Sequence, residues 1–270
     1  MTQLNAEWLG LQGRVCVVTG AGGGIGRAVA LGMAQAGASV VLLDRDEATC
    51  RETAEVLRPT AAKTLAIGCD IADPDSVAAA ERASRSIGPC DVLVNNAGML
   101  LAGSLATVPL NDWNRLLAVN LTGYLLCAQA FGKAMIERGR GAIVHTASIA
   151  GSNAQAFSGA YSVSKAGVLM LSRQLAVEWG PHGVRSNVMS PGLVRTPMSE
   201  SFYQAPGVIE RRAAAIPVGR IGTPEEMAQV VLFLASDRAG FVNGQEIIVD
   251  GGFEHMLMSL VPRPGFERGN

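Results

Sequence analysis

Short β-branched apolar runs alternate along the chain with longer stretches in which apolar residues recur at helical spacing. The short runs predict strands. These strands are expected at 14–19, 39–44, 64–70, 91–98, 141–148, 184–190 and 246–250. The longer stretches predict helices, which are expected at 25–37, 73–83, 111–138, 159–180 and 224–236.

The predicted strands are apolar throughout rather than alternately apolar and polar. Strands of this kind belong to parallel sheets that helices cover on both faces. We therefore predict an α/β fold with a doubly wound, mostly parallel seven-stranded sheet (Rossmann-type). The 270 residues show no repeat and no linker, and 49% apolar against 17% charged residues is enough for one large core. A single domain over 1–270 follows.

One segment breaks this alternation. Residues 192–220 are mixed in polarity and lie between a predicted strand and a late helix. Long inserts in compact domains are commonly lids or binding loops. We expect residues 192–220 to form a lid over the substrate.

Composition and charge argue against several classes of partner. The formal net charge is −1 and the Arg residues are scattered, so the basic face that nucleic acid requires is missing. No apolar run approaches the roughly 18 residues that span a bilayer, and the opening MTQLNAEWLG has neither part of a signal peptide. We expect a cytoplasmic protein with no membrane partner. The 5 Cys lack a C-x-x-C pair and the 3 His show no ligand spacing, which favours reduced thiols and no metal.

A glycine-rich stretch, VVTGAGGGIGRAVA, joins the first predicted strand to the first predicted helix. Glycines at this point let the backbone turn tightly and approach a pyrophosphate, and the helix N-terminus offers free N–H groups to that anion. The stretch predicts a dinucleotide site that includes Gly20, Gly24, Ile25 and Gly26.

An acidic residue ends the second predicted strand. Asp44 follows Gly26 at the distance typical of the carboxylate that accepts hydrogen bonds from the adenosine ribose. Such a carboxylate favours NAD because it repels the 2′-phosphate of NADP. Arg45 follows directly, and a guanidinium could instead pair with that phosphate. NAD is the predicted cofactor, with NADP as the alternative.

The stretch GAYSVSKAG places Tyr161 four residues before Lys165, so a helix carries both on one face. A free phenol has a pKa near 10, and an adjacent ammonium lowers it, which suits proton transfer to or from an alcohol oxygen. The alternative interpretation is a half-buried Tyr beside a Lys that reaches solvent.

The ordered set of motifs resembles the short-chain dehydrogenase/reductase family, from about Gly13 to Gly252. TGAGGGIG at 19–26 is similar to the family's cofactor loop, and NNAG at 95–98 to its motif after the fourth strand. Ser148 stands thirteen residues before Tyr161, the family's usual spacing, and SPGLVRTPM is similar to the segment that closes over the nicotinamide.

The resemblance implies roles for individual residues. Tyr161 is the general acid/base, and Lys165 lowers its pKa and bonds the nicotinamide ribose. Ser148 bonds the substrate oxygen, and Asn120 holds a water that links Lys165 to solvent. The remaining cofactor contacts that the resemblance implies are Asp70, Ile71, Asn95, Asn96, Ala97, Gly98, Pro191, Gly192, Val194 and Thr196.

The substrate is less well determined by the sequence. Expected substrate contacts are Ala150, Asn153, Gln155 and Phe202. Polar groups after Ser148 suit a polyol, a sugar or a cyclic alcohol. An apolar ketone would instead be suited by Met99, Leu100, Leu101, Phe202 and Tyr203. Asn153 and Gln155 could also serve only the loop backbone. The predicted activity is the NAD-dependent interconversion of a secondary alcohol and its ketone. The alternatives are an NADPH-dependent 3-oxoacyl-carrier reductase and a non-catalytic NAD-binding regulator.

Residues 253–270 run past the usual end of the family's last strand and include the apolar MLMSLV. The resemblance also implies a homotetramer built through the long helices. We expect the C-terminal extension to pack across the tetramer interface, and truncation after Phe253 tests this.

Overall fold

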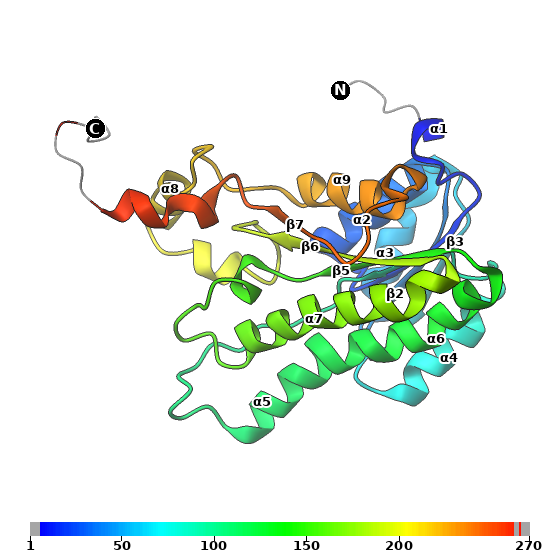
Figure 1. The fold of residues 1–270 in the computed structure, drawn as a ribbon, viewed down its shortest axis with the longest axis horizontal. Coiled ribbons are helices and arrows are strands. Elements are labelled where there is room, and N and C mark those ends of the chain that lie inside the picture. Colours follow the sequence, from blue (N-terminus) through cyan, green and yellow to red (C-terminus); the bar gives the residue numbers. More distant parts are fainter. Residues whose placement is uncertain (1–5, 262–264, 266–270) are drawn as a thin grey trace.

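A computed structural model describes residues 6–261 and 265. Its centre is a sheet of seven parallel strands in the order β3-β2-β1-β4-β5-β6-β7 (Figure 1). The strands are β1 (Val15–Thr19), β2 (Ser39–Asp44), β3 (Thr64–Gly68), β4 (Val92–Asn95), β5 (Gly141–Thr146), β6 (Val184–Pro191) and β7 (Glu246–Val249). All seven lie within predicted apolar runs or within one residue of them, and the α/β prediction is confirmed.

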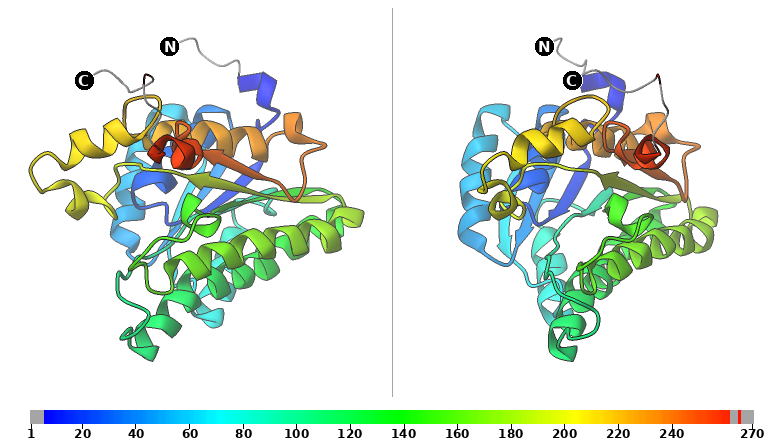
Figure 2. Two further views of the ribbon diagram at one scale, coloured as in Figure 1. Left: turned by 60° about the vertical axis from the view of Figure 1, so that its left-hand side comes forward. Right: turned by 90° about the vertical axis from the view of Figure 1, so that its left-hand side faces the viewer.

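Helices cover both faces of the sheet (Figures 1 and 2). One face carries α2 (Gly24–Gln35), α3 (Glu47–Leu57) and α9 (Pro224–Ala235). The other face carries α4 (Pro74–Ser84), α5 (Leu110–Leu117), α6 (Gly123–Arg138) and α7 (Tyr161–Trp179). Two further helices, α1 (Ala6–Leu9) and α8 (Val208–Ala215), lie outside these layers. The sheet therefore separates two apolar clusters, as a doubly wound sheet requires.

The long helical stretch predicted at 111–138 is not one regular helix. α5 runs into a single wide π-helical turn at Ala118–Thr122, and α6 follows at once. Such turns insert one extra residue and are frequent at functional sites. Here the turn holds Asn120, which is completely buried.

The order of the strands fixes where a ligand can bind. From β1 the chain moves outward through β2 and β3, then returns to form β4 on the other side of β1. Between β1 and β4 the connections diverge, which leaves a crevice at the carboxyl ends of the strands. The glycine-rich turn after β1 and the loop after β4 both open into this crevice.

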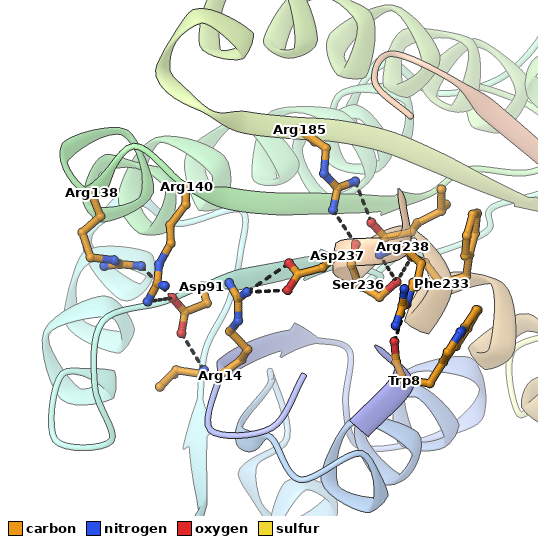
Figure 3. A network of polar contacts seen from close by, with 12 residues as sticks. Trp8, Arg14, Asp91, Arg138, Arg140, Arg185, Phe233, Ser236, Asp237 and Arg238 are labelled. Carbon is orange, nitrogen blue, oxygen red and sulfur yellow. Dashed lines mark hydrogen bonds and ion pairs between the residues drawn. The ribbon is translucent and has the colours of Figure 1, made fainter. Parts of the chain in front are cut away.

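The amino-terminal ends of the strands, opposite the crevice, hold a network of ion pairs and hydrogen bonds (Figure 3). Asp91, just before β4, is 6% exposed and accepts a hydrogen bond from the backbone N–H of Val15 at 2.9 Å. Arg138 Nη2 lies 3.2 Å from Asp91 Oδ1, and Arg140 Nη2 lies 3.7 Å away. Arg185 donates to the carbonyl of Leu234 in α9 and to that of Ser236, the residue that follows the helix. These contacts join the strand starts to the helices around them.

Replacement of Asp91 with Asn is expected to lower the free energy of unfolding by about 2–4 kcal/mol, because it leaves Arg138 without its buried partner. Arg140→Gln is the matched control. The Arg140 side chain is 61% exposed, so its loss is expected to cost less than about 1 kcal/mol. Urea unfolding of both variants measures the difference, and equal effects would contradict a central role for Asp91.

Candidate active site

A cavity of about 1060 Å³ lies at the carboxyl edge of the sheet. Residues at or just after the carboxyl ends of β1, β2, β4, β5 and β6 line it, together with α7 and the segment 192–220. The segment contains a 3-10 turn at Glu200–Tyr203 and α8. In Figures 1 and 2 the 3-10 helix Phe253–Leu260 lies beside α8, and Phe253 also lines the cavity.

The glycine-rich turn presents backbone rather than side chains to the cavity. Gly20 has φ +66° and Gly24 has φ +51°, backbone angles that residues other than glycine rarely adopt. A Cβ on Gly26 would lie 2.0 Å from the carbonyl oxygen of Gly20, so only glycine lets α2 start this close to the turn. Gly23, at the N-cap of α2, offers no side chain to cap the first N–H groups. These donors are available to an anion, which fits a dinucleotide pyrophosphate.

Two side chains fix the ends of this turn. Asn96 Nδ2 donates to the carbonyls of Thr19 and Gly20, at 3.1 and 3.3 Å. Asp44 Oδ2 accepts a hydrogen bond from the N–H of Gly22 at 3.1 Å, and its Oδ1 accepts one from Asp46 N at 3.2 Å. Asp44 also lines the cavity, so its side chain both holds the glycine turn and belongs to the cavity wall.

Tyr161, Lys165 and Ser148 meet in the same cavity. Tyr161 begins α7, and its hydroxyl hydrogen-bonds the side chain of Ser148, which stands just after β5. One turn further along α7, Lys165 Nζ donates to the carbonyl oxygen of Thr146 at 2.8 Å. Nζ also lies 5.7 Å from the centre of the Tyr161 ring. The helical spacing and the strand end therefore bring the three side chains together.

Burial controls the protonation of this group. It lowers the pKa of Lys165 to about 7. It raises the pKa of Tyr161 above the ordinary value of 10.0, and the hydrogen bond from Ser148 only partly opposes the rise. Burial of the phenol thus acts against the lowering that the sequence predicts. That Lys165 lowers the pKa of Tyr161 stays a prediction. At neutral pH the phenol keeps its proton.

Asn120 lies beneath the cavity rather than in its lining. Its Oδ1 accepts from Met99 N at 2.8 Å, and its Nδ2 donates to Met99 O and to Ser164 Oγ at 2.9 and 3.2 Å. Asn120 thus holds the backbone after β4 against α7. A water held by Asn120 stays a prediction.

Comparisons with known proteins agree with this geometry. Residues 20–254 match the family model described as enoyl-(acyl carrier protein) reductase. The chain is 40% identical over 244 residues to the D-threitol dehydrogenase of Mycolicibacterium smegmatis. The aligned region covers 90% of this chain and 94% of that protein. A short-chain type dehydrogenase/reductase from Mycobacterium marinum superposes with a TM-score of 0.86 at 35% identity, over 92% of this chain and 99% of its own. The chain belongs to the short-chain dehydrogenase/reductase family.

A third comparison bears on the cofactor of this short-chain dehydrogenase/reductase. The gluconate 5-dehydrogenase of Burkholderia cenocepacia, solved with NADP and tartrate, has a TM-score of 0.86 at 33% identity and covers 90% of this chain and 96% of its own. The protein is accordingly a nicotinamide-dependent oxidoreductase that acts on CH–OH groups.

The structure places most of the predicted site residues of this short-chain dehydrogenase/reductase in the cavity lining. These are Gly20, Gly24, Ile25, Asp44, Asn96, Ala97, Gly98, Ser148, Ala150, Asn153, Gln155, Tyr161, Lys165, Pro191, Gly192, Val194, Thr196 and Phe202. Gly26 and Asn120 support the lining from behind. Asn153 Nδ2 bonds Ile149 O and Glu254 Oε2, so part of its polarity serves the loop.

Besides Gly26, four predicted cofactor contacts lie outside the lining. Arg45 and Asp70 are exposed, and Ile71 is buried against Gly123. Asn95 is completely buried and bonds Tyr124 O and the ring of His145, whose pKa burial lowers to about 3. It is Asn96, the next residue, that lines the cavity.

Sequence reasoning missed several residues of the lining. Phe253 belongs to it, and so do Arg211 and Arg212 on α8. For Arg211 and Arg212 the only sequence signal was the mixed polarity of the segment 192–220 that contains them. Within residues 6–261 and 265, no group of three or more His, Cys, Asp or Glu could hold a metal ion. No helix in the same range is long and apolar enough to cross a membrane.

Proposed function

We propose that the chain is an NAD-dependent oxidoreductase that interconverts a secondary alcohol and its ketone, with a polyol, sugar or cyclic alcohol as substrate. The observation that carries the proposal is the meeting of Tyr161, Ser148 and Lys165 in one cavity with the glycine turn. A bound nicotinamide dinucleotide supplies the hydride in reduction and accepts it in oxidation. The protein supplies position, charge and the proton.

Proton transfer at the substrate oxygen is assigned to Tyr161. Its raised pKa keeps the phenol protonated at neutral pH, so Oη can donate to a ketone oxygen. Ser148, which bonds the same phenol, is placed to donate to that oxygen as its negative charge develops. Oxidation of an alcohol needs the phenolate instead. Oxidation is therefore expected to speed up as the pH rises, and reduction to slow down.

The preference for NAD is assigned to Asp44. Its carboxylate lines the cavity at the end of β2, whereas Arg45 is exposed and lies outside the lining. A carboxylate accepts hydrogen bonds from ribose hydroxyls and repels a 2′-phosphate. The arrangement favours NAD over NADP.

Replacement of Asp44 with Asn is expected to raise the ratio of kcat/KM for NADP to that for NAD by roughly tenfold to a hundredfold, because it removes a charge-assisted hydrogen bond and a repulsion. Asp46→Asn is the control, since Asp46 caps α3 outside the lining. Steady-state kinetics with each cofactor measure both ratios. An unchanged ratio in Asp44→Asn would assign cofactor choice to other residues.

A substrate panel tests the proposal as a whole. The purified protein is incubated with NAD or NADP and a series of polyols, sugars, cyclic diols and simple secondary alcohols, and the absorbance of the reduced cofactor is followed at mildly alkaline pH. Turnover of one of these alcohols with NAD supports the proposal. Turnover only with NADP would favour the 3-oxoacyl-carrier reductase, and cofactor binding without any turnover would favour a regulatory protein.

We further propose a homotetramer built through α6 and α7, with residues 192–220 as a lid. Val163, Met170 and Val177 recur at intervals of seven along α7 and are 48%, 58% and 75% exposed, which forms an apolar stripe. In the C-terminal extension Leu257 and Leu260 are also exposed, while residues 262–264 and 266–270 lie outside the described residues. Light scattering is expected to give a tetramer mass, and a smaller one for Met170→Glu. Truncation after Phe253 tests the extension separately.

A further inference from the structure

Four arginines lie in the segment 192–220, and they differ in their partners. Arg195 Nη2 lies 2.6 Å from Glu200 Oε1, and Arg220 pairs with Glu226. Arg211 and Arg212 have no carboxylate within 4.0 Å in the part of the chain that the structure describes. These two are also the ones that line the cavity. The unpaired cations therefore coincide with the ligand site.

Aromatic rings hold one of these cations in place. Arg212 Cζ lies 4.7 Å from the centre of the Tyr203 ring and 5.6 Å from that of Phe202. Tyr203 is only 5% exposed, whereas Phe202 is 40% exposed, so the Tyr203 ring is the buried support of the guanidinium. A guanidinium that lies over an aromatic ring can still offer N–H donors to an anion. The natural partner of a guanidinium's fork of donors is an anion with two oxygens.

Positive side chains outnumber negative ones in the lining of the cavity. The charged side chains of its lining are Asp44, Lys165, Arg211 and Arg212. Asp44 stands at the end of β2, on the side of β1 away from β5, whereas Lys165 bonds the residue that ends β5. Asp44 is thus the one negative side chain of the described lining, and Lys165, Arg211 and Arg212 are positive. A cleft lined by one sign of charge concentrates ligands of the opposite sign.

We propose that Arg211 and Arg212 bind a carboxylate at the end of the substrate remote from the reacting hydroxyl. The proposal rests on the proposed function and narrows its substrate class to secondary alcohols, and their ketones, that carry a carboxylate. The carbon chain between the two groups lies against the apolar part of the lining, including Met99 and Phe202. The phosphate groups of the cofactor are the other anions that Arg211 and Arg212 could bind. The tests below distinguish a substrate carboxylate from a cofactor phosphate.

The kinetic test compares acids with neutral partners of the same shape. Straight-chain hydroxycarboxylates of increasing length are assayed beside their methyl esters in the wild type, Arg211→Gln and Arg212→Met. The wild type is expected to prefer the acid. Each variant is expected to lower the acid-to-ester ratio of kcat/KM by roughly tenfold to a hundredfold, mainly through KM. Arg173→Gln, an exposed arginine of α7 outside the lining, is the control of equal charge change and is expected to keep the wild-type ratio.

A binding test needs no turnover. Titration calorimetry measures the binding of cyclohexanecarboxylate and of cyclohexylmethanol in the presence of saturating cofactor. The wild type is expected to bind the acid more tightly than the alcohol. Arg212→Met is expected to bind the two compounds equally. Equal binding of acid and alcohol by the wild type would overturn the inference. A lower affinity for the cofactor in the variants, with the acid-to-ester ratio unchanged, would overturn it too and assign the arginines to phosphate. Absence of turnover for every compound would defeat the proposed function, and the calorimetry would still decide the anion site.

Discussion

Replacement of Tyr161 with Phe is expected to lower kcat by roughly a hundredfold to ten-thousandfold, because it removes the group that exchanges a proton with the substrate oxygen. The ring stays in place, so the Kd for the cofactor is expected to change little. Steady-state kinetics and a fluorescence titration of the cofactor measure the two quantities separately. Loss of both together would indicate damage to the fold rather than to the chemistry.

Tyr203→Phe is the matched control for this change. Tyr203 lines the same cavity, and its hydroxyl makes no hydrogen bond within the described residues. Removal of that hydroxyl is expected to preserve most of kcat. If Tyr161→Phe retained kcat within tenfold of the wild type, the group that exchanges the proton with the substrate would have to be another residue.

Replacement of Lys165 with Met is expected to reduce turnover and, at the same time, to stabilise the fold. The pKa of Lys165 falls from 10.5 to about 7 on folding because the ammonium is buried. Below pH 7 the folded protein carries the full penalty of that buried charge. Between pH 7 and 10.5 the unfolded chain binds more protons than the folded one, so the free energy of unfolding rises with pH, by about 1.4 kcal/mol per unit.

The gain in unfolding free energy from Lys165→Met is therefore expected to be larger at pH 6 than at pH 10. Urea unfolding at the two pH values measures it, with Lys133→Met on the exposed face of α6 as the control. The control is expected to change stability little and equally at both pH values. A destabilised Lys165→Met at pH 6 would show that the packing of the lysine stem outweighs the charge.

The fold was predictable from the sequence where one physical term dominated. A strand buried on both faces must be apolar along its length, and β2 was predicted to the residue for that reason. Helix α3 was missed because only Cys50, Thr53 and Leu57 of its residues are buried, which gives a weak apolar period. The π-helical turn at Ala118–Thr122 was invisible for a similar reason, since one extra residue leaves the composition of a helix unchanged.

The candidate site divides in the same way. One turn of helix brings Tyr161 and Lys165 together, and the glycine turn is built from glycines that are close neighbours in the sequence. Local spacing therefore predicts both features. Arg211 and Arg212 reach the cavity only because the path of 192–220 returns over the sheet edge, and no local pattern encodes that path. The pKa of Tyr161 depends on burial by distant segments, which also lies beyond what spacing can predict.

The five cysteines give the protein an internal set of probes. All are free and buried, and burial raises the pKa of each thiol, that of Cys50 to about 12. Because the thiolate is the reactive form, an alkylating reagent at neutral pH reaches these groups only when the surrounding structure opens. Cys16 and Cys50 lie in the cluster on one face of the sheet, and Cys69, Cys90 and Cys127 in the other. Labelling rates resolved by peptide would time the opening of each half of the core separately, without any introduced label.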